Sequence, residues 1–184
     1  MNKKSFLGLA LAFATFSLNA SEVIRVTDGD TIVFDGVTTE EGIGNNIKCR
    51  IEGIDTPEKF NSKKLNKFAQ KYDISIEHIK DSGKKASDYA TNIFVSFKDT
   101  ESGLSVTSDS LDVYKRNLCR VSLNGSDYGI KILEDGYAVV YKNGKYMKDS
   151  EYKLKLIQAQ QRAIENKAGL WAEYADVMEA MKND

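Results

Sequence analysis

The chain has 184 residues, of which 41% are hydrophobic and 29% are charged, as in ordinary folded globular domains. This length suits one domain with a substantial core and is too short for two of ordinary size. A formal net charge of −1 excludes a globally basic nucleic-acid-binding protein, and no internal repeat or low-complexity tract indicates a fibrous or disordered chain.

The first twenty residues have the pattern of a secretory signal peptide. A short basic start precedes an apolar run from Phe6 to Leu18, and Ala20 is a plausible last residue before cleavage. An uncleaved anchor and a core helix are the alternatives, but the run is short against the roughly 20 residues of a membrane span. We therefore predict a signal peptide at 1–20, a secreted or periplasmic protein with no stable membrane association after cleavage, and a single mature domain at 21–184.

Residues 22 to 54 have a β pattern. Apolar and β-branched residues at 23–26 lead to the turn Thr27–Asp30, and the strand-like run Thr31–Phe34 follows it. A polar loop at 38–46 leads to a third strand at about 47–54. These consecutive strands indicate a three-stranded antiparallel meander.

The third strand runs into an acidic turn that holds the only proline of the chain. Pro57 fixes its own backbone and pushes Thr56 towards an extended conformation, so the carboxylates of Asp55 and Glu58 lie on a rigid corner. Taken alone, the stretch fits a solvated strand end, because Asp, Thr and Pro are ordinary turn residues. The guanidinium of Arg50 on the preceding strand makes a functional site the alternative.

Residues 59 to 97 are predicted to form two helices, the second capped by Asp81 or Ser82. The stretch 59–85 holds eight lysines against three acidic residues, a local net charge of +5 (8 − 3). Such a run is most often a solvated helix face, although a basic face can also attract a polyanion. His78 is interpreted as a surface residue, because a lone histidine is a poor basis for a metal site.

The second half of the chain continues with strands at about 104–108 and 116–123. A short helix from Asp127, an extended segment at 137–141 and a longer helix capped at Asp149 or Ser150 follow. The pattern predicts an α+β fold in which a five-stranded Greek-key barrel of the OB type carries about three to four helices.

Cys49 and Cys119 are the only cysteines of the chain. They have no CxxC spacing and no local histidine, and this pattern argues against a zinc site. Both lie in strand-like runs, so either they pair or they are small apolar residues on two strands. Because the predicted destination is oxidising, our hypothesis is one disulfide across adjacent strands.

Charged residues gather at three strand ends. These are Asp30 within Asp28–Thr31, the stretch Arg50–Glu58, and Arg116 within Asp112–Arg116. The patterns D-G-D-T, R-x-x-G-I-D-T-P-E and D-x-Y-x-R, followed by D-G-x-A and a terminal Leu-Trp, resemble the staphylococcal nuclease (thermonuclease) family over roughly residues 22–174. The chain is similar to its secreted bacterial members.

The resemblance implies a role for each matching residue. Asp30, Asp55 and the Thr56 carbonyl would bind Ca²⁺, and Glu58 would be the general base that acts on the attacking water. The two arginines, Arg50 and Arg116, would bind the scissile phosphate, and Tyr114 would lie near the nucleotide.

The residue types also suit phosphodiester hydrolysis independently of the family resemblance. A phosphodiester is an anion, so its hydrolysis needs charge neutralisation and a deprotonated water at one point. Oxygen ligands suit a hard cation such as Ca²⁺, and arginine presents a planar pair of donors to phosphate. A carboxylate that takes the proton of the water typically contributes about 10²–10⁴-fold.

The chain departs from the family pattern in three respects. Loss of Lys3 and Lys4 with the signal peptide would change the net charge from −1 to −3, whereas familiar secreted members are basic. Residues 59–80 resemble a lysine-rich helical insertion, and we predict that Lys63, Lys64 and Lys67 bind the substrate strand. In addition, Lys115 stands where the family often has glycine.

The sequence therefore predicts a monomeric, calcium-dependent nuclease outside the cytoplasm that cleaves DNA and RNA, with single strands preferred. The resemblance further implies products with 3′-phosphates. The alternative is a non-catalytic nucleic-acid-binding OB-fold module. A binding module has no reason to hold Asp30, Asp55 and Glu58 near a phosphate, and this favours the nuclease.

Overall fold

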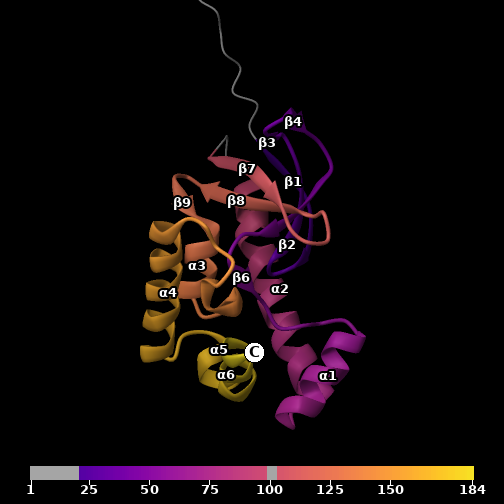
Figure 1. Cartoon of the computed structure of the whole chain (residues 1–184), viewed down its shortest axis with the longest axis vertical. Coiled ribbons are helices and arrows are strands. Elements are labelled where there is room, and N and C mark those ends of the chain that lie inside the picture. The colour runs from indigo at the N-terminus through magenta and orange to yellow at the C-terminus, as the bar shows by residue number, and fades with distance from the viewer. Residues whose placement is uncertain (1–20, 99–102) are drawn as a thin grey trace, which may run out of the picture.

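The computed structural model describes residues 21–98 and 103–184 (Figure 1). The predicted signal peptide lies outside the described residues. A curled sheet occupies one end of the domain, and α1, α5 and α6 lie at the other end (Figure 1). Within the described part of the chain, no helix is both long and apolar enough to cross a membrane.

The main sheet is mixed, with the strand order β1-β2-β5-β8-β7-β3-β4 and with β9 paired to β8. The predicted meander is present, because β1 pairs with β2 and β2 with β5, both antiparallel. β5 then pairs with β8 in parallel. The strands of this sheet are β1 (Glu22–Asp28), β2 (Thr31–Asp35), β3 (Val37–Thr39), β4 (Gly42–Gly44), β5 (Ile47–Ile51), β7 (Leu104–Leu111), β8 (Asn117–Leu123) and β9 (Ser126–Asp127).

The α+β class and the OB-like sheet are confirmed, but the strands are divided more finely than expected. The predicted loop at 38–46 contains the hairpin β3–β4, in which Thr38 pairs with Ile43. Strand β3 is three residues long and is fixed by parallel pairing with β7. Strands this short have no visible period in the sequence, so tertiary pairing decides them. A second, two-stranded sheet joins β6 (Ile54–Asp55) to β10 (Val139–Val140).

Six α-helices are described, against the three to four expected, because the C-terminal segment forms two separate short helices. They are α1 (Lys63–Tyr72), α2 (Ile76–Lys98), α3 (Tyr128–Glu134), α4 (Ser150–Glu165), α5 (Leu170–Glu173) and α6 (Ala175–Asn183), and the 3₁₀ turn η1 (Tyr141–Gly144) precedes α4.

Helix α2 begins earlier than the sequence predicts. Instead of Asp81 or Ser82, Ser75 receives the backbone N–H of His78 on its side-chain oxygen (N···Oγ 3.2 Å), which satisfies a free donor of the first turn. His78 therefore lies within α2, where its Nε2 is 3.1 Å from a carboxylate oxygen of Asp176 on α6.

Two hydrophobic clusters form the core. The larger one lies between the sheet and helices α2, α3 and α4, and contains Phe34, Ile51 and Leu156. The smaller one joins Leu65 of α1 to Val177 of α6 and to Trp171. The lysine-rich segment is thus packed onto the C-terminal helices through its apolar face, since Leu65 is fully buried.

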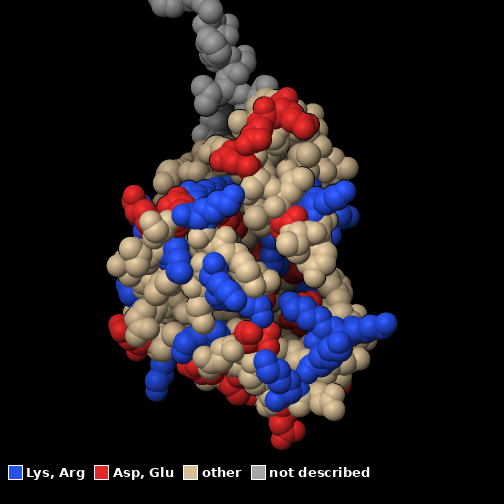
Figure 2. Space-filling view, viewed as in Figure 1, with Lys and Arg blue, Asp and Glu red and all other residues tan. Residues whose placement is uncertain are grey.

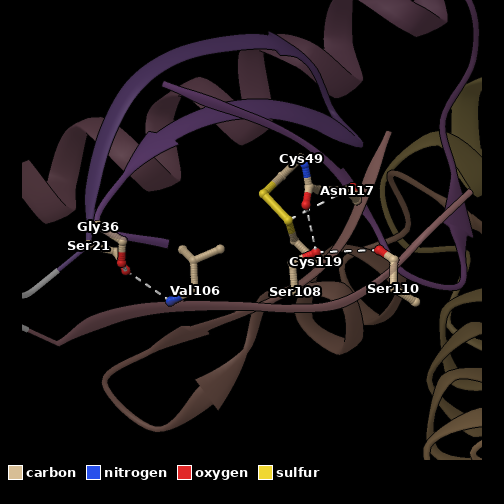
Figure 3. Close-up of a disulfide and its surroundings, with 8 residues drawn as sticks. All are labelled: Ser21, Gly36, Cys49, Val106, Ser108, Ser110, Asn117 and Cys119. Atoms are coloured by element: carbon tan, nitrogen blue, oxygen red, sulfur yellow. Dashed lines mark hydrogen bonds between the residues drawn. A yellow bond between two sulfur atoms is a disulfide. The ribbon is translucent and has the colours of Figure 1, made fainter. Parts of the chain in front are cut away.

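Cys49 and Cys119 form a disulfide between β5 and β8 (Figure 3). Their Cα atoms are 5.5 Å apart, and both side chains are fully buried. The bond lies next to Arg50 in the chain, so it links the strand that carries this arginine to the central strand of the sheet.

Candidate active site

A cleft of about 1330 Å³ opens between the sheet, α1 and the loop that joins β7 to β8. Lysine and arginine side chains gather over α1 beside this hollow (Figure 2). The volume exceeds the roughly 300–1,000 Å³ typical of small-molecule pockets and so fits an extended ligand. Most of the predicted site residues line the cleft, namely Asp30, Arg50, Asp55, Thr56, Glu58, Lys64, Tyr114 and Arg116, whereas Lys63 and Lys67 lie outside its lining.

Arg50 holds the two predicted metal-binding carboxylates together. Its guanidinium forms one ion pair with Asp30 and a second with Asp55, and it donates to the backbone carbonyl of Ile54 (Nη2···O 3.1 Å). Thr31 on β2 pairs with Arg50 on β5, which places Asp30 at the same end of the sheet. The strand register therefore brings together charges that are 20 and 25 residues apart in the sequence.

Burial and charge act in opposite directions at these carboxylates. Burial raises the pKa of Asp30 and of Asp55 above the usual value, and the neighbouring Arg50 partly offsets this. At Arg50, burial lowers the pKa, but the ion pairs with Asp30 and Asp55 outweigh it and the pKa is raised. The guanidinium therefore stays protonated, and its charge offsets only part of the effect of burial on the two carboxylates.

The turn that carries Asp30 is fixed from two sides. Thr56 donates its backbone N–H to the Asp30 carboxylate (N···Oδ2 2.9 Å), and Thr31 donates its hydroxyl to the other oxygen (2.9 Å). Behind the turn, the buried Tyr128 of α3 donates its hydroxyl to the carbonyl of Gly29 (2.7 Å). A Cβ at Gly29 would lie 2.8 Å from the side chain of Thr56, so this close approach requires glycine.

These residues fit a hard divalent cation. Among the described residues, no three His, Cys, Asp or Glu side chains form a cluster that could hold a metal, so two carboxylates and a backbone carbonyl would need water to complete the ligand set. One observation favours a cation here: Oδ1 of Asp28, which also lines the cleft, is buried without a hydrogen-bond partner in the described structure. In addition to burial, the carboxylate of Asp28 raises the pKa of Asp30 beside it, and a cation at this point would offset the repulsion between the two.

Glu58 follows Pro57 at the edge of the cleft and is partly exposed. Its Oε1 lies 2.8 Å from the ammonium of Lys64, which is also 3.7 Å from Oδ2 of Asp55. Helix α2 supports this turn closely, because a Cβ at Gly83 would lie 2.6 Å from the carbonyl oxygen of Pro57. Burial lowers the pKa of Lys64, but Asp55 and Glu58 outweigh it and the pKa is raised.

Asp112 organises the loop that presents Arg116. Its carboxylate accepts the backbone N–H groups of Tyr114 (2.8 Å) and Arg116 (2.9 Å) on one oxygen and the Nε–H of Arg116 (2.6 Å) on the other. The guanidinium carbon lies 5.5 Å from the centre of the Tyr114 ring. Lys115 between them has φ +61°, the left-handed region that glycine adopts most easily.

Asp28, Asp112 and Tyr141 are among the cleft residues that the sequence did not point to as site residues. The first two lie inside motifs that were quoted, so their position beside a predicted site residue was an available signal. Tyr141 follows β10, and it reaches the cleft because β10 pairs with β6, where Val139 is opposite Asp55. Its ring centre is 6.0 Å from the guanidinium carbon of Arg50. No local pattern predicts that pairing.

The fold and the site together define an α+β protein with an OB-like sheet whose cleft combines carboxylates and arginines. Residues 48–173 match the family described as "Staphylococcal nuclease homologue". The chain is 31% identical over 158 residues to the thermonuclease of Staphylococcus hyicus, covering 84% of this chain and 79% of that protein. It is 28% identical over 169 residues to the uncharacterized protein MJ1439 of Methanocaldococcus jannaschii, covering 82% and 70%. The chain belongs to the staphylococcal nuclease homologue family.

Proposed function

We propose that this protein is a calcium-dependent nuclease that hydrolyses phosphodiester bonds in DNA and RNA. The observation that supports it most is that one cleft is lined by two arginines, Arg50 and Arg116, and by three carboxylates, Asp30, Asp55 and Glu58. Arginines provide planar donors for a phosphate, and carboxylates provide oxygen ligands and a base. The name of the thermonuclease relative points to the same activity.

In the proposed reaction, Asp30, Asp55 and the carbonyl of Thr56 would hold the calcium ion, which would supply Lewis-acid chemistry at a phosphate oxygen. Glu58 accepts a proton from the attacking water, whose oxygen forms the new bond to phosphorus. Arg50 and Arg116 donate hydrogen bonds to the phosphate as negative charge develops on it. The bond from phosphorus to the 5′ oxygen breaks, so the products carry a 3′-phosphate and a 5′-hydroxyl.

Exposed aromatic rings support single strands as the preferred substrate. Tyr114 is 77% exposed and Tyr141 is 41% exposed, and both residues line the cleft. Unpaired bases stack on such rings without regard to sequence. Lys63 and Lys67 are exposed on α1, where they would attract the strand backbone from outside the cleft. We further propose that the protein acts as a monomer, secreted or periplasmic, after removal of residues 1–20.

A chelator-controlled cleavage assay tests this function. Purified protein is incubated with single-stranded DNA, double-stranded DNA and RNA in the presence of Ca²⁺, of Mg²⁺, or of excess EGTA. We expect cleavage with Ca²⁺, none with EGTA, and products whose termini are substrates for a 3′-phosphatase. Cleavage unaffected by EGTA would contradict calcium dependence. Binding of the single strand without cleavage under all conditions would favour the non-catalytic binding module.

A further inference from the structure

The ammonium group of Lys64 occupies the carboxylate edge of the cleft. It lies 2.8 Å from Oε1 of Glu58 and 3.7 Å from Oδ2 of Asp55. These are the general base and one of the metal ligands of the proposed function, on which the following inference rests. Lys64 therefore faces into the site, although the sequence predicts that it binds the substrate strand together with Lys63 and Lys67.

The charges around Lys64 favour a cation at this position. Four carboxylates line this part of the cleft, from Asp28, Asp30, Asp55 and Glu58, and Arg50 neutralises only part of their charge. Lys64 supplies a second positive charge beside Glu58 and Oδ2 of Asp55, whereas Arg50 pairs with Oδ1 of Asp55. Asp55 is the carboxylate that the ammonium and a bound divalent cation would share, so the two cations compete at Asp55, while Glu58 holds the ammonium beside it.

The packing of α1 fixes the position of the Lys64 backbone beside the carboxylates. Ser62 caps the helix by accepting the N–H of Leu65 (3.0 Å), and the Leu65 side chain, next in the chain to Lys64, is fully buried in the cluster with α6. The Lys64 side chain itself is 61% exposed, so its four-carbon stem can turn while its Cα cannot leave. A tethered ammonium of this kind is present at the site in every molecule.

We propose that Lys64 is a built-in counter-ion that holds Asp55 and Glu58 in the metal-free protein, is displaced when the divalent cation binds, and thereby lowers the affinity of the site for that cation. Removal of the Lys64 ammonium leaves Asp55 and Glu58 without this counter-ion. It also removes a positive charge that repels the divalent cation from a distance of a few ångströms. At the dielectric of a partly exposed site, this corresponds to a roughly five- to tenfold gain in affinity.

Calorimetric titration with calcium chloride, at constant ionic strength and without nucleic acid, tests this proposal. The proteins are the wild type, Lys64→Met, which keeps the stem and removes the charge, and Lys64→Arg, which keeps the charge. The matched control is Lys63→Met, because Lys63 precedes it on α1 and makes no ion pair with a described residue. We expect a dissociation constant about five- to tenfold lower for Lys64→Met. The other two variants should stay within about twofold of the wild type, because neither removes the charge next to the carboxylates.

The outcomes separate this inference from the proposed function. Calcium binding by the wild type with an equal or weaker affinity in Lys64→Met would overturn the counter-ion role and leave the calcium-dependent function intact. An equal gain in Lys63→Met would also overturn it, because the effect would then be one of overall charge. Absence of calcium binding in all four proteins would overturn the calcium dependence and the counter-ion role together.

Discussion

The backbone N–H of Thr56 donates a hydrogen bond to the carboxylate of Asp30 (N···Oδ2 2.9 Å), which joins two turns that are 26 residues apart. Both residues are buried. This contact fixes the carboxylate relative to the turn that carries Asp55 and Glu58. The candidate site is therefore built on two turns held by the sheet instead of on one mobile loop.

Replacement of Glu58 by Gln should reduce cleavage strongly. The amide keeps the size of the side chain but cannot accept the proton of the attacking water, so kcat should fall by about 10²–10⁴-fold. Steady-state cleavage of single-stranded DNA with saturating Ca²⁺ measures this. The matched control is Glu41→Gln on the exposed β3–β4 hairpin, outside the lining of the cleft. Wild-type kcat in Glu58→Gln would rule out Glu58 as the base.

Asp112→Asn should weaken the presentation of Arg116 without removing the arginine. The loop loses a charged partner of Arg116, so activity should fall, but less than in Arg116→Ala. Asp109→Asn is the matched control, because Asp109 lies within β7 and lines the same cleft, so this variant removes an equal charge from it. The same activity loss in both variants would show that Asp112 acts only through its charge.

The Asp112 contacts also predict a pH dependence of the loop. Burial raises the pKa of Asp112, but the hydrogen bonds from Arg116 outweigh it, and the pKa lies below its usual value. A lowered folded pKa means that the stabilisation is fully present above about pH 4 and is lost as the pH falls further. Hydrogen exchange of the 110–116 amides between pH 3 and 6, corrected for the intrinsic rate, measures this. Protection that already declines near pH 6 would contradict the assignment.

The exposed lysines of α1 should act on substrate binding instead of on the chemical step. Lys63→Ala with Lys67→Ala should raise KM, leave kcat nearly unchanged and reduce the salt slope of single-strand binding by about 0.7 for each lost phosphate contact. Fluorescence anisotropy with a labelled oligonucleotide over a series of salt concentrations gives the slope. Lys131→Ala with Lys155→Ala on α3 and α4 removes the same charge outside the lining of the cleft. An unchanged slope in the α1 variant would exclude the contact.

Loss of the Cys49–Cys119 bond should lower the free energy of unfolding by about 2–4 kcal/mol, because the bond constrains a long loop of the unfolded chain. The two cysteines are 70 residues apart in the sequence. Urea denaturation of the Cys49→Ala, Cys119→Ala protein against the wild type measures the difference. Added reductant should destabilise only the wild type. Equal stability of both proteins, with and without reductant, would show that the bond contributes nothing.

Lys115→Gly should stabilise the loop before Arg116. Lys115 has a left-handed φ of +61°, which costs a residue with a side chain about 1–2 kcal/mol relative to glycine. The gain from glycine is smaller than this cost, because glycine has more conformational freedom to lose when the chain folds. A net gain of about 0.5–1 kcal/mol in the free energy of unfolding is expected. Val113→Gly is the control, because Val113 is exposed and has no positive φ. A gain in the control as large as in Lys115→Gly would refute the strain at Lys115.

Local chemistry was sufficient to predict several elements. The helical spacing of apolar residues predicts α4, because Tyr152, Leu156 and Ala163 lie on one face of the helix and are all buried. Its cap at Asp149, whose side chain accepts the N–H of Tyr152, follows from the preference of helix starts for such side chains. The antiparallel pairing of β1, β2 and β5 follows from turn residues between β-branched runs. Each of these signals lies within a few residues of the structure that it predicts.

The sequence by itself therefore determined the class of fold and the residue types of the cleft, because turns, caps and periodic apolar faces depend on neighbours in the chain. Only the tertiary structure decided that Thr56 donates a hydrogen bond to Asp30, that α1 and α6 share one hydrophobic cluster, and that Tyr141 reaches Arg50. These contacts join segments whose pairing depends on the packing of the whole chain, and no local period or turn residue encodes them. The physical reason is that long-range contacts are selected by burial and charge in the folded molecule, which become defined only when all the elements are in place.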